Sequence, residues 1–240
     1  MASTKYSRLE LWAHYADVCN VVFDRMPVNG SPYDADCAIA LSFGRNSITD
    51  YRLPDVRNFY DVFKQDIETM DHISHPYFSG FDPGQANYDI ARRTHACVMT
   101  YQLPVIIQWE IAMSLYQQSD EAWVKNRYAH QELFYLWPPA RPGYRTIEVL
   151  EDAFKITQEK GWKRPLLLAH DYHLPRVAML ARHFWPEFII GFPSITCVFD
   201  LASVKPMTAS PAAWHIYELK ARIHHFMYGW TFGRFKSGRF

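Results

Sequence analysis

Two kinds of hydrophobic pattern alternate along the chain, and their spacing predicts an alternation of strands and helices. Short apolar runs between turn residues predict buried strands at 37–43, 105–109, 165–169 and 187–192. Longer segments with apolar residues every three or four positions predict helices at about 7–25, 54–70, 88–101, 121–136, 146–160, 175–184 and 211–228. The sequence therefore predicts an α/β protein.

The uniformly apolar strands favour one Rossmann-like domain with a mostly parallel sheet and helices on both faces. In such sheets ligands bind beyond the carboxyl ends of the strands, at a topological switch point. We therefore expect the polar residues that follow each strand to converge there. The expected organisation is an N-terminal helix packed on the domain (1–30), the α/β domain (31–230) and a basic C-terminal tail (231–240).

Composition and charge exclude several classes of protein. The 240 residues are 49% hydrophobic, and 25 Lys and Arg balance 25 Asp and Glu, so no basic excess supports a nucleic-acid partner. The first residues carry charges throughout, unlike a signal peptide, and no run approaches the roughly 18 apolar residues of a membrane span. Four cysteines without a C-x-x-C pair fit reduced thiols. We expect a soluble cytoplasmic protein without a membrane partner.

The sequence HDYHLPR, at 170–176, lies where a predicted strand meets a helix. The first turn of that helix would offer free N–H groups to an anion, and Arg176 would add a planar donor fork. His170 and Asp171 are further candidate ligand contacts. His173 is a candidate catalytic acid or base, because an unperturbed histidine has a pKa of about 6.5. The alternatives are an Arg176 paired with an acidic neighbour and histidines with structural roles.

A divalent metal is a second interpretation of the same histidines. His170, Asp171 and His173 are types that ligate metals, but they lack a zinc-site spacing and a clear further ligand. We therefore assign no metal ligand.

The second candidate site is SFGRN, at 42–46, directly after a predicted strand. Gly44 would let the backbone approach a ligand closely, and Ser42 and Arg45 could donate hydrogen bonds to it. The segment lacks the second glycine of a dinucleotide-binding loop and the lysine of a P-loop. A plain turn is the alternative.

Four further polar residues are candidates. Glu110, on the same side of the predicted strand as Gln108, could accept from a ribose or a substrate amine, or act as a general base; its alternative is a helix cap. Thr94 and Thr146 are candidate ligand contacts or ordinary helix residues. Glu218 would form a salt bridge with an arginine or histidine. No Gly-x-Ser-x-Gly elbow or Cys–His spacing points to covalent catalysis.

The order of these motifs resembles the YdcF/SanA-like proteins (domain of unknown function 218) across about residues 34–229. The resemblance rests on the strand before Gly44, the helix with Arg93 and Thr94, and three segments: PVIIQWE (104–110), YRTIEVL (144–150) and LLLAHDYHLPRVAML (166–180). Many members have two glycines after the first strand, where this chain has SFGRN, and many have an N-terminal membrane helix, which we do not expect in this chain.

The resemblance implies a Rossmann-like fold with a polar pocket at the strand ends. His173 and Arg176 would match the family's His-x-x-Arg pair, Thr146 the threonine that opens the preceding helix, and Glu218 the acidic residue near the C-terminal end. One branch of the family is associated with S-adenosylmethionine, which makes this molecule a candidate cofactor. The membrane-anchored branch is associated with envelope roles.

The sequence thus predicts an enzyme that acts on a small anionic or nucleotide-like metabolite, by hydrolysis or group transfer. One alternative is a non-catalytic protein that binds or senses the same ligand. The other is an interaction protein that docks a partner through its aromatic N-terminal helix and basic tail. The sequence does not fix the oligomeric state.

Overall fold

The computed structural model describes residues 28–44, 82–118, 133–136, 145–191, 198–203 and 205–228. Four short parallel strands form one sheet in the order β3-β2-β1-β4. The strands are β1 (Cys37–Ala40), β2 (Val105–Gln108), β3 (Leu133–Leu136) and β4 (Pro165–Leu168). The reversal of strand order between β2 and β4, on either side of β1, places a topological switch point at the carboxyl end of β1.

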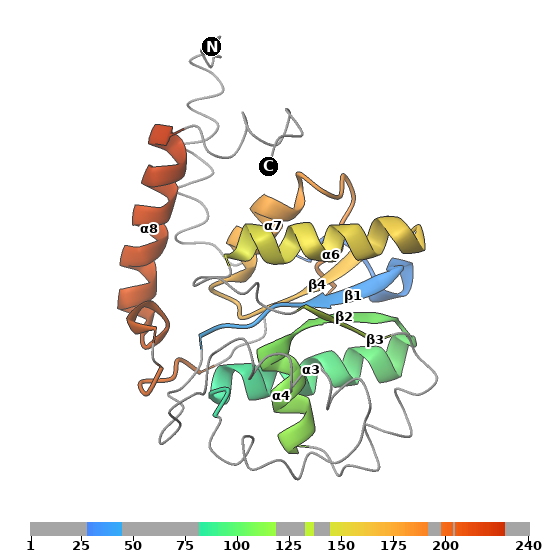
Figure 1. The fold of residues 1–240 in the computed structure, drawn as a ribbon, viewed down its shortest axis with the longest axis horizontal. Helices are drawn as coiled ribbons and strands as arrows, with labels where there is room; N and C mark the ends of the chain where they lie inside the picture. Colours follow the sequence, from blue (N-terminus) through green and yellow to red (C-terminus); the bar gives the residue numbers. More distant parts are fainter. Residues whose placement is uncertain are drawn as a thin grey trace, which may run out of the picture.

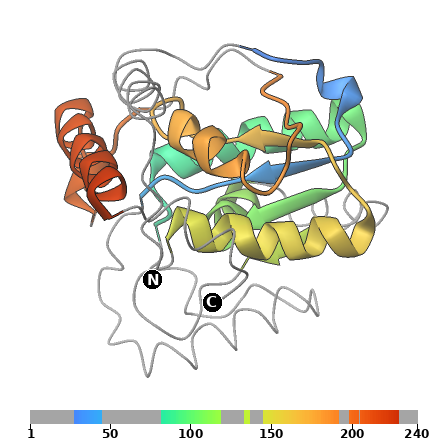
Figure 2. The same cartoon turned by 90° about the horizontal axis from the view of Figure 1, so that it is seen from above.

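Helices cover both faces of this sheet (Figure 1). The helices are α3 (Gln85–Tyr101), α4 (Trp109–Gln118), α6 (Thr146–Lys160), α7 (Leu174–Ala181) and α8 (Pro211–Tyr228), with the short 3-10 helices η1 (Pro32–Asp34) and η2 (Pro206–Thr208). Helices α3 and α4 lie on one face, and α6 and α7 on the other (Figures 1 and 2). The predicted Rossmann-like α/β fold is confirmed.

The two faces of β1 explain why its residues are apolar throughout. Ala38 and Ala40 pack in the cluster that includes residues of α3 and α4. Cys37 and Ile39 point the other way, into the cluster that includes α6 and α7. Burial raises the pKa of the Cys37 thiol far above its usual value, so this cysteine is a core residue rather than a nucleophile.

Three predicted elements differ from the structure. The segment 133–136, predicted as the end of a helix, is the edge strand β3, because its aromatic residues pair in register with β2. The strand predicted at 105–109 ends at Gln108, and Trp109 opens α4, so Glu110 lies on a helix and not beside Gln108 on a strand. The strand predicted at 187–192 reduces to a single bridge between Ile189 and Leu166.

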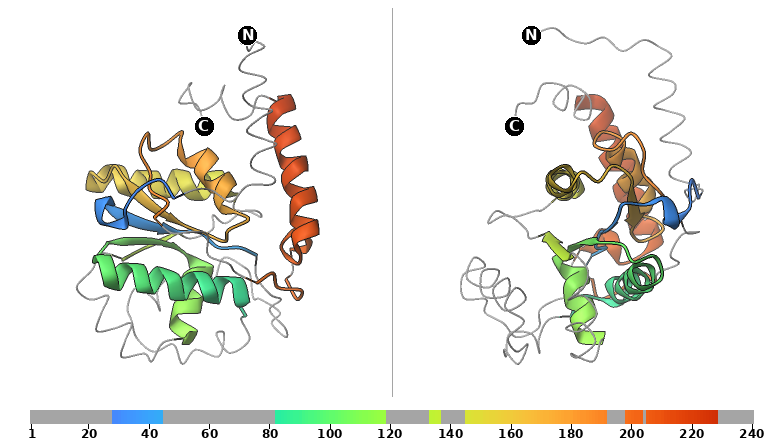
Figure 3. Two further views of the ribbon diagram at one scale, coloured as in Figure 1. Left: turned by 180° about the vertical axis from the view of Figure 1, so that it is seen from behind. Right: turned by 90° about the vertical axis from the view of Figure 1, so that its right-hand side faces the viewer.

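The helices predicted at 7–25 and 54–70 lie outside the described residues, as does the tail at 231–240. Helix α8 stands at the end of the sheet where β1 and β4 terminate (Figures 1 and 3). Among the residues that the structure describes, no helix has the length and apolar character needed to cross a membrane.

Candidate functional site

The chain that leaves β1 is held in place by two buried amide side chains. The backbone N–H of Ser42 donates to Gln108 Oε1 at 3.1 Å, which ties the carboxyl ends of β1 and β2 together. The N–H of Phe43 donates to Asn87 Oδ1 at 2.8 Å, and Asn87 Nδ2 donates to the Gly44 carbonyl at 2.9 Å. Sequence reasoning missed Asn87; its signal was a polar residue on the buried side of α3, which also carries Thr94.

Gly44 is closely approached by a group of the protein itself, and its predicted contact with a ligand stays a prediction. Its φ is +67°, and a Cβ there would overlap the hydroxyl of Thr208 in η2. That hydroxyl lies 2.6 Å from Ser203 Oγ. The Gly44 turn is therefore closed by the segment that leads into α8. Arg45, the neighbouring candidate, lies outside the described residues.

The turn after β4 buries two histidines and an aspartate. His170 Nδ1 lies 2.9 Å from Asp171 Oδ1, and the His170 ring stacks on Phe43 with centroids 3.8 Å apart. The N–H of Tyr172 donates to Asp171 Oδ1 at 3.0 Å. Helix α7 begins at Leu174, one residue before the predicted start, with His173 at its N-cap. The polar residues therefore converge on the end of β1, as the fold requires.

His173 contacts the first residue of α6. Its Nε2 lies 3.2 Å from Thr146 Oγ1, although the two residues are 27 positions apart. Burial lowers the pKa of His173 well below its ordinary value, and the positive charge of Arg176 acts in the same direction, followed by His170 and Lys205; the backbone of Ser42 opposes them. His173 is therefore neutral at neutral pH.

Arg176 forms a buried ion pair with α8. Its Nη1 lies 2.8 Å from Glu218 Oε1. The guanidinium carbon is 4.9 Å from the ring centre of Trp214 and 5.2 Å from that of Tyr217. The indole of Trp214 also donates to the Tyr172 carbonyl at 2.9 Å. The salt bridge predicted for Glu218 and the acidic partner named as an alternative for Arg176 are thus the same interaction.

The remaining predicted residues have structural contacts. The hydroxyl of Thr94 donates to the Ile90 carbonyl at 2.8 Å, within its own helix. Glu110 is buried in the first turn of α4, at the same edge of the sheet, and its carbonyl accepts from Ser114 Oγ at 2.9 Å. Within the described ranges, no three His, Cys, Asp or Glu side chains are grouped as metal ligands.

The structure thus brings seven of the predicted residues to the carboxyl edge around β1 and β4. They are Ser42, Gly44, Thr146, His170, Asp171, His173 and Arg176.

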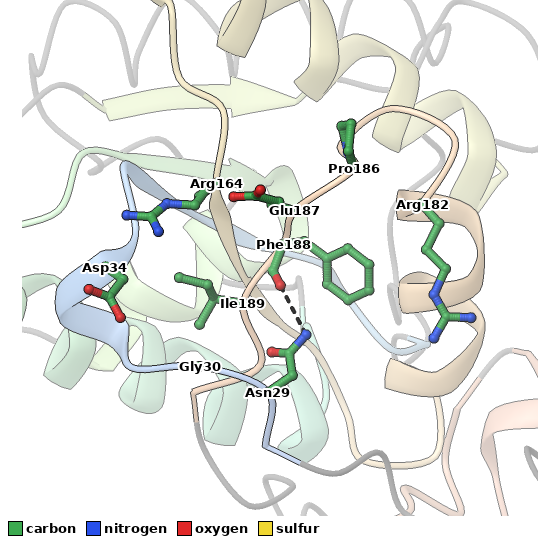
Figure 4. Close-up of a pocket in the computed structure, with 9 residues that line it drawn as sticks. All are labelled: Asn29, Gly30, Asp34, Arg164, Arg182, Pro186, Glu187, Phe188 and Ile189. Atoms are coloured by element: carbon green, nitrogen blue, oxygen red, sulfur yellow. Dashed lines mark hydrogen bonds between the residues drawn. The ribbon is translucent and has the colours of Figure 1, made fainter.

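A cavity of about 490 Å³ lies at the opposite edge of the sheet, before the strands begin (Figure 4). It shares no residue with the candidates above. Its charged side chains are Asp34, Arg164, Arg182 and Glu187, two of each sign. Because these charges balance, this cavity offers no field that favours an anion, and the predicted site remains the one at the carboxyl edge.

Comparison with known proteins adds no family: no family model matches the chain, and no curated protein or solved structure is significantly similar to it. The resemblance to the YdcF/SanA-like proteins stays a prediction from the motifs.

Proposed function

We propose that this chain is an enzyme that acts on a small anionic or nucleotide-like metabolite at the carboxyl edge of its sheet. The observation that carries the proposal is the contact between the half-buried hydroxyl of Thr146 and Nε2 of a buried, neutral His173. A neutral imidazole beside a hydroxyl can accept its proton, which is the first requirement of hydrolysis or group transfer.

The ion pair between Arg176 and Glu218 supports an anionic ligand. A guanidinium packed against two neighbouring aromatic rings is a rigid receptor for one carboxylate or phosphate oxygen pair, and Glu218 now supplies that carboxylate. Arg176 Nε is buried without a hydrogen-bond partner among the described residues, so the guanidinium has a donor left. In this proposal the ligand's anionic group takes the place of Glu218 and α8 shifts.

S-adenosylmethionine remains a candidate cosubstrate through the resemblance to the YdcF/SanA-like proteins. Its carboxylate would suit Arg176, and an acceptor deprotonated with the help of His173 would receive its methyl group. This version of the proposal predicts that the molecule binds the protein and is consumed only when an acceptor is present.

A non-catalytic sensing protein is the second candidate, and the same ion pair favours it. A ligand that displaced Glu218 would release α8 from Arg176 and so convert binding into a change of shape. Such a protein would need Arg176 but not the proton-transfer group His173.

One experiment separates the two functions. Calorimetric titration with nucleotides, S-adenosylmethionine, inorganic phosphate and small carboxylates would be paired with product analysis on wild type, His173→Gln and the control His183→Gln, which changes a histidine beyond the other end of α7. If the protein is an enzyme, we expect turnover in wild type and His183→Gln but not in His173→Gln, and ligand binding in all three proteins. Binding without turnover in wild type indicates the sensing protein, and no binding of any of these ligands would overturn both.

A further inference from the structure

The geometry points to Thr146 as a nucleophile that takes an acyl group from an ester or thioester of a small acid, with His173 as its base. This inference rests on the proposed enzymatic function and names the reacting group. No sequence motif points to covalent catalysis, because the two residues come from different elements, α6 and the start of α7.

The two ring nitrogens of His173 show which proton the histidine can take. Nδ1 is buried and makes no hydrogen bond of good geometry among the described residues, although the backbone of Ser42 is near enough to raise the pKa of the ring. Nε2 lies 3.2 Å from Thr146 Oγ1. A neutral imidazole has one accepting nitrogen, and a proton on Nδ1 leaves Nε2 free to accept from Thr146. The proton within reach of this base is therefore that of the Thr146 hydroxyl.

Exposure decides which of the two residues meets a substrate. His173 is only 6% exposed, whereas Thr146 is half-buried and reaches the surface. A molecule that arrives from solvent thus encounters the hydroxyl before the imidazole. His173 acts on the substrate through Thr146, as a base acts through a nucleophile in other hydroxyl-dependent transferases and hydrolases.

The backbone around Thr146 is fixed, which a nucleophile requires. Glu148 accepts from both the backbone N–H and the guanidinium of Arg145, each at 2.9 Å, and so locks the start of α6. Thr146 is the first residue of this 15-residue helix. The positive end of the helix therefore lies beside Oγ1 and favours the negative charge that develops there as the proton leaves.

The charges at the site favour an acyl over a phosphoryl group. A phosphate monoester brings close to two negative charges to the reacting centre and needs unpaired cations around it. Arg145 is paired with Glu148, and Arg176 is occupied by Glu218 or, in the proposed function, by the ligand's own anionic group, while Lys205 is the weakest of the charges that lower the pKa of His173. An acyl carbon carries no net charge before attack, so it does not need a further cation beside Thr146.

The reaction balances without any further reagent. Thr146 Oγ1 bonds to the carbonyl carbon while its proton passes to His173 Nε2, and the carbonyl π electrons move to oxygen. When they return, the bond from carbon to the leaving alcohol or thiol breaks, and that group takes the proton from Nε2. Water, deprotonated by the same nitrogen, then attacks the acyl-threonine. When this intermediate collapses, the bond from carbon to Thr146 Oγ1 breaks, Oγ1 takes the proton back from Nε2, and the acid is released.

The test uses p-nitrophenyl acetate as the acyl donor. Wild-type protein would be mixed with the ester, quenched in acid and analysed by intact mass and peptide mapping, while nitrophenolate release is followed. We expect one acetyl group on the peptide that contains Thr146, an initial burst of nitrophenolate, and loss of both in Thr146→Val. The expected loss of rate is at least about 100-fold, the usual share of an acid–base group.

Two variants make the outcome unambiguous. Thr146→Ser keeps a hydroxyl and should retain the adduct, and a wild-type-like unfolding transition of Thr146→Val shows that its loss of adduct is not unfolding. Thr94→Val removes a hydroxyl bonded within α3 and should change nothing. Turnover that persists in Thr146→Val but disappears in His173→Gln would overturn the nucleophile and leave the proposed enzyme standing. Absence of adduct and turnover in wild type, while a metabolite still binds, would overturn the acyl chemistry alone.

Discussion

Arg176 Nη1, in the first turn of α7, lies 2.8 Å from Glu218 Oε1 of α8, and the two side chains form a buried ion pair. Trp214, one turn before Glu218 in α8, and the adjacent Tyr217 place their rings against the same guanidinium. The ion pair is therefore the charged centre of the contact between α8 and the end of the sheet. It also occupies the group that the proposed function assigns to an anion.

Replacing Glu218 with Gln should lower stability and raise affinity for anions at the same time. The substitution leaves a buried guanidinium without its counter-charge, which typically costs about 3–5 kcal/mol. The same substitution removes the carboxylate that competes with the ligand for Arg176. Urea unfolding measures the first effect, and calorimetric titration with inorganic phosphate the second. The matched control is Asp152→Asn, which breaks an exposed pair with Lys155 and should cost about 1 kcal/mol at most. Unchanged phosphate affinity in Glu218→Gln would contradict the proposed anion position.

The buried His173 should make the protein less stable in mild acid. The folded pKa of His173 is depressed, so between that value and the unfolded value of about 6.5 the unfolded chain binds more protons. The stabilising contribution is thus complete above about pH 6.5 and is lost as pH falls toward the folded pKa, by up to roughly 1.4 kcal/mol per pH unit. Urea unfolding at several pH values, in wild type and His173→Gln, measures the slope. Parallel slopes in the two proteins would show that His173 does not titrate as described.

Gly44 and Gly161 form a matched pair for testing the turn after β1. Both have positive φ, +67° and +74°, but a Cβ on Gly44 would overlap Thr208 and one on Gly161 would meet nothing within 4 Å. Alanine at Gly161 should therefore cost only the strain of a left-handed residue, about 1 kcal/mol. Alanine at Gly44 should cost clearly more, about 2–4 kcal/mol, because the η2 segment must move. Equal losses in thermal or urea unfolding would show that Thr208 does not pack on Gly44.

The strand cores and the start of α7 could be predicted from sequence because they depend on local patterns. Apolar runs marked β1, β2 and β4, and Pro175 after a polar turn marked the helix start. The prediction for the edge strand β3 was wrong, because only its pairing with β2 distinguishes its four residues from the end of a helix.

The contacts of the site could not be predicted in the same way. The bonds from Asn87 to Phe43 and Gly44 span more than 40 residues, and a polar residue on the buried side of α3 does not indicate which backbone it binds. The pair Thr146–His173 likewise depends on how α6 and α7 cross one face of the sheet. The sequence indicated which residue types follow the strands, whereas packing between helices determines which of their atoms meet.

The most direct test of the central claim, that the carboxyl edge holds a small anion at Arg176, removes both charges of the buried pair together. The double variant Arg176→Met/Glu218→Leu replaces the ion pair with apolar side chains of similar length, a change that often leaves stability unchanged. Calorimetric titration would then compare it with wild type against inorganic phosphate, small carboxylates, nucleotides and S-adenosylmethionine. The account predicts a ligand that binds wild type and loses at least about tenfold in affinity, or about 1.4 kcal/mol, in the folded double variant. A ligand that binds both proteins equally would contradict it.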